Sequence, residues 1–238
     1  MNRKVVFSFS SLALALLIGL AGGTFTGAKT LPKYVPPPPR DERRQSTVSG
    51  GSRGCDGIRN VSVTPLVPID HVPTTTLSHP TFLFHLDAIF PRPLIFTLVE
   101  PGVAEPIFQK KFTLARAGIV SLNLPANSKG LEEGKEYYWT IALSCNDKRP
   151  SANTYARAAI ERVPVSSELK RELDAESDRL GKAEMYALAG IWYDALALSY
   201  RSDVPARERS GETDYFRQLL QQIGLNRILQ DEDFANRH

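Results

Sequence analysis

Histidine and carboxylate side chains between residues 79 and 87 have the types and spacing that suggest chemistry. His85 and Asp87 lie on one face of a strand-like run, with His79 just before it, because successive strand side chains alternate between faces. A carboxylate that orients a histidine is a feature of metal centres and of general-base sites. No third ligand or nucleophile follows at a matching spacing, so a metal-dependent hydrolase is the weakest of our hypotheses.

Other catalytic signatures are missing from the sequence. The acidic residues between Glu168 and Asp178 alternate with Lys170, Arg171 and Arg179 at helical neighbour spacing, which indicates a solvated helix with ion pairs. The chain has no Gly-x-Ser-x-Gly, P-loop, dinucleotide-binding or His-Glu-x-x-His motif. We therefore expect a protein that is not an enzyme, with no catalytic residues, cofactor or metal.

Aromatic residues near the C-terminal third are the candidates for protein binding. Trp and Tyr are frequent at the energetic centres of interfaces, which makes Tyr186, Trp192 and Tyr193 our candidate protein-interaction residues. The alternative is that Trp192 packs inside the chain, and the sequence leaves both interpretations open.

A second aromatic group lies on the predicted strands. Phe84, Phe108 and Tyr138 would offer a platform for a sugar ring if they shared one exposed face. Aromatic residues on strands more often belong to the core, because their large apolar area favours burial. A glycan partner is therefore possible and ranks below a protein partner.

The first 28 residues predict export. Arg3 and Lys4 precede an apolar run that ends at Leu20, and Ala28 closes a small-x-small cleavage pattern. The run is shorter than the roughly 20 residues that span a bilayer. We expect a signal peptide over residues 1–28, cleavage near Ala28, no membrane span afterwards, and a periplasmic or secreted location.

The charge of the chain argues against nucleic acid as a partner. The formal net charge is +3, and removal of Arg3 and Lys4 with the signal peptide would lower it by two. Nucleic-acid binders present a clustered basic face. The basic clusters at residues 40–44 and 207–209 contain interleaved acids, so we read them as solvated loops.

Cys55 and Cys145 are the two cysteines of the chain. An oxidising compartment favours a disulfide between them, and two unpaired buried thiols are the alternative. The bridge would close a loop of about 90 residues and contribute roughly 4 kcal/mol through loop-closure entropy.

Composition divides the mature chain into three regions. Residues 29–54 predict a disordered tether, since Pro36–Pro39 favours polyproline II and the rest is rich in Arg, Ser and Gly. Residues 55–163 have a hydrophobic period of two, and residues 164–238 have a helical period. We expect a β-sandwich followed by a helical C-terminal region.

The β region has a distinctive turn before a predicted central strand. Leu131, Gly134 and Tyr137 lie at the offsets of a tyrosine corner, in which the Tyr hydroxyl bonds to the backbone just upstream. Seven strand-like runs separated by turn residues indicate an antiparallel sandwich. The runs are Val61–Val67, Thr81–Asp87, Leu94–Glu100, Ile107–Leu114, Ile119–Leu124, Glu136–Cys145 and Thr154–Val163.

The helical region predicts several short helices. Ser166 and Ser167 are candidate N-caps of a charged helix that Gly181 would interrupt. Gly190 separates a small-residue helix from an aromatic-rich one, which suggests a helical hairpin. One terminal helix would follow and end at Gly224. The expected fold class is thus α+β.

Two resemblances extend this interpretation. The β region resembles a fibronectin type III or immunoglobulin-like domain, which implies that sandwich topology. Several segments, in the same order along nearly the whole mature chain, resemble an exported cyanobacterial family whose domain has no assigned function. These are Pro80–Phe82, Gly118–Leu122, Gly134–Lys135, Ser151–Asn153 and Ala189–Leu196. The family implies export and an architecture of this kind, and it supplies no functional residues.

The segment Ala189–Leu196 is also similar to one tetratricopeptide hairpin, with Gly190 in the turn and Trp192 and Ala195 in the following helix. A single hairpin of this type cannot bury its apolar face without neighbours. We therefore expect a non-enzymatic, exported protein-binding accessory or adaptor. A glycan- or envelope-binding module that uses the sandwich face is the alternative.

Overall fold

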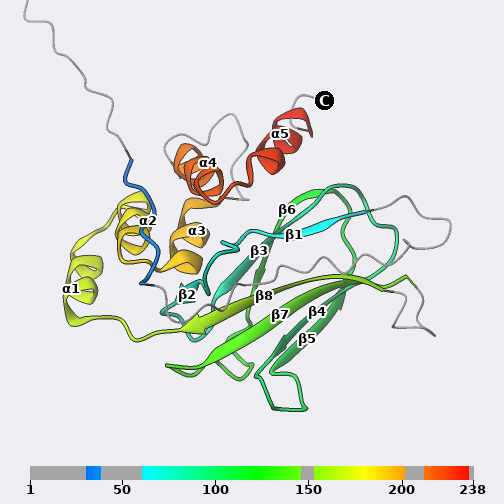
Figure 1. Ribbon diagram of the computed structural model, residues 1–238, viewed down its shortest axis with the longest axis horizontal. Helices are drawn as coiled ribbons and strands as arrows, with labels where there is room; N and C mark the ends of the chain where they lie inside the picture. Colours follow the sequence, from blue (N-terminus) through cyan, green and yellow to red (C-terminus); the bar gives the residue numbers. More distant parts are fainter. Residues whose placement is uncertain (1–30, 39–60, 146–152, 202–211, 236–238) are drawn as a thin grey trace, which may run out of the picture. The chain divides into compact units, whose positions relative to one another are not determined.

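The computed structural model describes residues 31–38, 61–145, 153–201 and 212–235 (Figure 1). The described residues belong to a mixed α+β unit that extends from Leu31. The predicted signal peptide and Cys55 lie outside them. Cys145 is buried just beyond the end of a central strand, and its pairing with Cys55 remains a prediction.

Two sheets make up the β part (Figure 1). One sheet has three strands in the order β1-β3-β6, and the other has five in the order β2-β8-β7-β4-β5. Every pair is antiparallel except β2 with β8. The strands are β1 (Val63–Pro65), β2 (Thr74–Thr75), β3 (Thr81–Leu86), β4 (Leu94–Val99), β5 (Phe108–Phe112), β6 (Gly118–Asn123), β7 (Glu136–Leu143) and β8 (Thr154–Arg162).

Five helices lie within the described part of the chain. They are α1 (Ser167–Ala175), α2 (Arg179–Leu188), α3 (Trp192–Ser199), α4 (Glu212–Gln222) and α5 (Asn226–Ala235). In this described part, none of the helices has the length and apolar character needed to cross a membrane.

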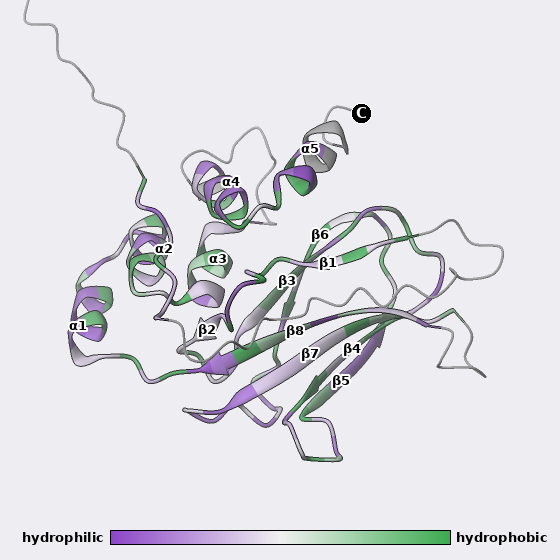
Figure 2. Cartoon of the chain, viewed as in Figure 1, coloured by the Kyte–Doolittle hydropathy of each residue, from purple (hydrophilic) through white to green (hydrophobic). Residues whose placement is uncertain are grey.

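The core joins the sheets to the helices. Along β7 the side chains alternate, so that Tyr137, Trp139, Ile141 and Leu143 are buried and the residues between them are half-buried. The Phe82 ring of β3 packs against Trp139 at 5.4 Å and against Tyr193 of α3 at 6.0 Å between ring centroids. By contrast, the edge strand β5 is hydrophilic along its middle (Figure 2).

The tyrosine corner is present as the sequence predicts. The Tyr137 hydroxyl accepts a hydrogen bond of 2.9 Å from the Glu132 backbone N–H. Gly134 has φ of +76°, a left-handed conformation that glycine adopts at little cost. This turn sets the direction in which the chain enters β7.

The helix boundaries match the sequence in part. The Ser166 side chain accepts a bond of 3.1 Å from the Leu169 N–H and caps α1, as expected. Gly181 does not break a helix but lies in the first turn of α2, where its N–H donates to the Asp178 carboxylate at 2.9 Å. The predicted terminal helix corresponds to α4, and a further helix, α5, follows Gly224.

Candidate functional site

The start of α3 holds Trp192, one of the predicted interaction residues, in the core. Its side chain is fully buried, and the indole Nε1–H donates to the Leu66 carbonyl at 2.9 Å. This bond ties α3 to the loop that follows β1. The position corrects the expectation of a surface anchor and agrees with the alternative that Trp192 packs inside the chain.

Tyr193 is buried as well. Its hydroxyl donates to the Ala159 carbonyl at 2.7 Å and accepts a bond of 2.7 Å from the Trp139 indole. Burial raises the pKa of Tyr193 far above its ordinary value, so the hydroxyl stays protonated. Tyr193 thus bridges two central strands and, like Trp192, presents nothing to a partner at the surface.

Asp194 completes this set of contacts. Its carboxylate accepts bonds from the Thr75 hydroxyl at 2.5 Å, the Thr76 hydroxyl at 2.6 Å and the Thr76 N–H at 2.9 Å. Burial raises the pKa of Asp194, and the three hydrogen bonds oppose that shift without cancelling it. We call Trp192, Tyr193 and Asp194, with the strand and loop groups that they bind, the α3 dock.

Tyr186, the third predicted interaction residue, is half-buried on α2. Its hydroxyl is hydrogen-bonded to the Thr76 side chain, and burial raises its pKa. Of the three candidates, Tyr186 alone keeps part of its ring at the surface. The aromatic residues Tyr186, Trp192 and Tyr193 therefore attach the helices to the β region.

Residues 31–38, which we call the strap, lie beside α2 (Figure 1). The sequence places them in a disordered tether, yet the Tyr34 side chain is only 2% exposed. Its ring packs edge-on against Trp192 at 4.9 Å and stacks over His71 at 5.7 Å between centroids. The tether interpretation is thus wrong for the strap, while residues 39–54 lie outside the described part.

Polar side chains hold the strap through its backbone. The Gln222 amide bonds Tyr34 twice, accepting from its N–H at 2.9 Å and donating to its carbonyl at 2.5 Å. One turn earlier on α4, the Gln218 amide donates to the carbonyls of Leu31 and Pro32 at 3.2 and 3.0 Å. The two glutamines, four residues apart, therefore follow the extended backbone of the strap.

The C-terminal end of α2 also contacts the strap. We call the site that α2, α4 and the Pro68–His71 loop form around the strap the strap groove. The Val35 N–H donates to the Ala187 carbonyl at 3.0 Å. Gly190 has φ of +78°, and a Cβ at that position would lie 3.0 Å from the Val35 carbonyl oxygen. The Gly190 carbonyl accepts from the Thr74 hydroxyl at 3.0 Å and from the Tyr34 hydroxyl at 3.4 Å. Glycine is required here both for the turn and for the close approach of the strap.

A hollow of about 180 Å³ lies beside Tyr34. Within it the Asp70 carboxylate lies 2.7 Å from His71 Nδ1, and His71 Nε2 lies 2.7 Å from the Tyr34 hydroxyl. An acid, a histidine and a hydroxyl in this order are the groups of a nucleophilic site. Burial and then the charge of Asp70 raise the pKa of Tyr34 well above its usual range, however, which disfavours a reactive phenolate. The arrangement suits binding better than catalysis.

The predicted metal site does not form. His79 bonds the Ser78 hydroxyl at 3.0 Å and the Ser128 carbonyl at 3.2 Å, and His85 is buried within β3. Asp87 is exposed beyond β3, and its carboxylate accepts from the Ser62 N–H. In the part of the chain that the structure describes, no three His, Cys, Asp or Glu residues gather as a metal centre would require.

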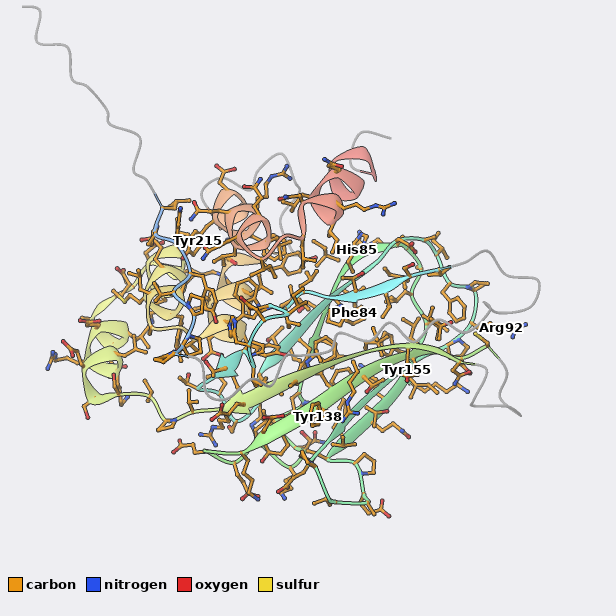
Figure 3. All side chains as sticks on the ribbon, viewed as in Figure 1. Phe84, His85, Arg92, Tyr138, Tyr155 and Tyr215 are labelled. Carbon is orange, nitrogen blue, oxygen red and sulfur yellow. The ribbon has the colours of Figure 1, made fainter. Side chains whose placement is uncertain are left out.

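The predicted sugar platform is divided between faces (Figure 3). Phe84 is fully buried in the three-stranded sheet, whereas Tyr138 lies in the five-stranded sheet. Phe108 pairs in register with Leu98, which faces the core. The guanidinium of Arg157 covers one face of the Tyr138 ring at 3.9 Å. These three aromatic residues cannot bind one sugar together.

Sequence reasoning missed the strap groove. The signal was the Gln218–Gln222 spacing on α4 together with an aromatic residue in a proline-rich segment, but their pairing spans more than 180 residues. Periodicity reports only local structure.

The chain was compared with known proteins. Residues 48–232 match a protein-family model described as Domain of Unknown Function (DUF928). No curated protein and no solved structure matches the chain.

Proposed function

The chain belongs to the DUF928 family, and from this premise we propose that it is an exported, non-enzymatic accessory protein that binds an extended polypeptide segment. The observation that carries the proposal is the docking of the strap, because a groove that holds one extended segment has the chemistry to hold another. Its occupant buries Tyr34 as an anchor and offers its backbone to Gln218 and Gln222.

The contacts divide into general and specific ones, as in other peptide-binding sites. Hydrogen bonds to backbone N–H and C=O groups contribute affinity for any extended segment, and a pocket for a side chain adds specificity. Here Trp192, His71 and the Gly190 carbonyl surround the anchoring Tyr34. The prolines after Val35 favour an extended backbone before docking, which reduces the entropy lost on binding.

The remaining parts of the proposal concern architecture and location. An immunoglobulin-like sandwich is supported by the strand orders β1-β3-β6 and β8-β7-β4-β5 and by the tyrosine corner. A helical hairpin of α2 and α3 is supported by the short connection through Gly190. The pattern of the first 28 residues and the resemblance to an exported cyanobacterial family support a periplasmic location.

A peptide-binding experiment tests the proposed function. A full chain carrying Tyr34→Ala would have a free anchor pocket, and a labelled peptide with the sequence of residues 29–38 would be titrated into it by fluorescence anisotropy. We expect saturable binding, and at least tenfold weaker binding of the peptide with alanine in place of its tyrosine. The unchanged chain should bind the peptide more weakly, because its own strap competes at an effective concentration of order millimolar.

The matched control adds Gln218→Ala and Gln222→Ala to the Tyr34→Ala chain. This control should retain the same far-ultraviolet circular dichroism and lose binding of the peptide. If the Tyr34→Ala chain is folded and the peptide does not bind, the groove is a structural contact only and the proposed function is wrong.

A glycan-binding role has one observation in its favour. Tyr155 on β8 is 42% exposed, and its register opposite Ala142 places it on the same outward face of the five-stranded sheet as Tyr138 (Figure 3). Binding to cell-wall or polysaccharide fractions, lost on Tyr155→Ala while peptide binding is retained, would favour this second function.

A further inference from the structure

Tyr215 lies on α4, three residues before Gln218 and close to α2 (Figure 3). Its side chain is fully buried, and its hydroxyl has no hydrogen-bond partner among the residues that the structure describes. Buried hydroxyl groups are nearly always hydrogen-bonded, because an unpaired one loses its contacts with water without a replacement. The Tyr215 hydroxyl is therefore a candidate contact for a bound group.

Glu184 on α2 brings a negative charge to this hydroxyl. Burial and then the charge of Glu184 raise the pKa of Tyr215 above its ordinary value, so the hydroxyl stays protonated. The two groups interact electrostatically, yet the hydroxyl makes no hydrogen bond to the carboxylate. An ammonium group has three N–H donors and no acceptor, so a single one can donate both to the hydroxyl and to the carboxylate. The pair therefore has the chemistry of an ammonium site.

The strap follows α4 toward this pair at a regular pace. Gln222 and Gln218 are four residues apart, which is about 6 Å along the helix axis. Their partners in the strap, Tyr34 and Pro32, are two residues apart, which is about 7 Å in an extended chain. An extended segment in the groove thus advances by two residues for each turn of α4.

Both helices place the pair one turn beyond the described contacts of the strap. Gln218 also donates to the Leu31 carbonyl, and Tyr215 lies about one turn before Gln218 on α4. Glu184 lies about one turn before Ala187, whose carbonyl accepts from the strap backbone. At the pace of the strap, an amino acid two positions before Leu31 reaches the pair. That position lies five residues before the anchoring tyrosine.

We propose that the strap groove continues into a subsite, formed by Tyr215 and Glu184, that binds an ammonium group five positions before the anchoring tyrosine. The inference rests on the proposed function, because it names a second feature of the polypeptide segments that the groove would select. The chain's own sequence has Lys29 at this position. The ammonium is that of the lysine side chain or, after the predicted cleavage at Ala28, that of the new N-terminus.

Four peptides, labelled at the C-terminus and titrated into the full chain carrying Tyr34→Ala, test the subsite by fluorescence anisotropy. The first has the sequence of residues 29–38, the second is acetylated at its N-terminus, the third carries Lys29→Met, and the fourth has both changes. The fourth peptide has neither ammonium and should bind about fivefold more weakly than the first, because a charge-assisted hydrogen bond is lost. The second and third peptides identify which ammonium group binds.

Variants of the subsite provide the matched comparison. Glu184→Gln and Tyr215→Phe, each added to the Tyr34→Ala chain, should weaken binding of the first peptide about threefold or more and leave binding of the fourth unchanged. Glu172→Gln removes an exposed carboxylate from α1 and serves as the control. It should leave the affinities of both peptides unchanged.

Equal affinities of the first and fourth peptides would overturn the subsite and leave the strap groove in place, since both peptides would still bind through their tyrosine. A loss in Glu184→Gln and Tyr215→Phe that is the same for all four peptides also overturns the subsite, because such a loss does not depend on the ammonium. If no peptide binds the folded Tyr34→Ala chain, the proposed function is refuted and the subsite with it.

Discussion

The α3 dock and the strap are attached to the rest of the molecule in different ways. In the dock, consecutive side chains of α3 reach three separate parts of the β region, and each polar atom is buried with its hydrogen-bond partner. In the strap, one side chain is buried and most other contacts engage the backbone. Gly190 precedes the dock in the chain, and its carbonyl accepts from Thr74 of β2 and from Tyr34 of the strap.

The two kinds of attachment differ in how much stability is lost when they are disturbed. A buried network whose members are all bonded is costly to disturb, because each lost partner leaves a polar group unsatisfied. A segment held by its backbone and one anchor can leave while the helices and sheets stay folded. The motif that looked functional in the sequence stabilises the fold, and the segment that looked like a tether occupies the candidate site.

Trp192→Ala should break the dock most severely. It removes a fully buried indole and its bond to Leu66, and we expect a loss of about 3–5 kcal/mol in the free energy of unfolding. Urea denaturation followed by circular dichroism measures the loss. Tyr155→Ala, at an exposed position, is the control and should change the value by less than about 0.5 kcal/mol. A Trp192→Ala chain as stable as the original would place the indole outside the core.

Tyr34→Ala should release the strap at a lower cost, about 1–3 kcal/mol, because the strap leaves as a unit. Trypsin cleavage after Lys33, an exposed residue whose neighbouring backbone is held by the groove, should become at least tenfold faster. Tyr34→Phe keeps the ring contacts and should show an intermediate rate. Equal cleavage rates in all three chains would mean that the strap is not docked.

Tyr193→Phe tests the contribution of one shared hydroxyl to the α3 dock. It keeps the ring and leaves the Trp139 indole and the Ala159 carbonyl without the shared hydroxyl, at a cost of about 1–2 kcal/mol. Urea denaturation should register this loss, while trypsin cleavage after Lys33 should stay unchanged. Faster cleavage in this variant would show that dock and strap are coupled.

Asp194 should give the dock a pH dependence that the strap does not share. Because burial holds the folded-state pKa above the ordinary value of 3.8, the stability from this group is full below pH 3.8 and is lost as pH rises through the folded value. Asp194→Asn cannot ionise and should remove that part of the slope. Urea denaturation of both chains between pH 3.5 and 7 tests this, and parallel curves would contradict it.

The sequence predicted the strands well, because their signals are local. The alternation of apolar and polar residues predicted seven of the strands in the described regions to within a few residues. The Leu131–Tyr137 spacing predicted the tyrosine corner. The strand β2 was missed since it has two residues and pairs in parallel with β8. Gly181 was misread because the real break lies upstream, where Asp178 caps α2.

The candidate site could not be predicted from the sequence, for a physical reason. Whether Trp192 faces a partner or the core depends on the carbonyl of Leu66, more than 120 residues away. The same holds for the strap, since a Pro-rich segment with one tyrosine has the composition of a linker until a groove is present to receive it. Local composition indicates which conformations a segment can adopt by itself. Contacts with residues distant in the sequence decide which of them it has in the folded chain.

The two glutamines of α4 have a further consequence. Amide groups carry no net charge, so the bonds from Gln218 and Gln222 to the strap backbone are not screened by dissolved ions. These backbone contacts of the strap should therefore keep their strength from dilute buffer to the salinity of seawater. Such tolerance would suit the exported location proposed above, and the choice of bound segment in this part of the groove would then depend on the fit of one aromatic ring.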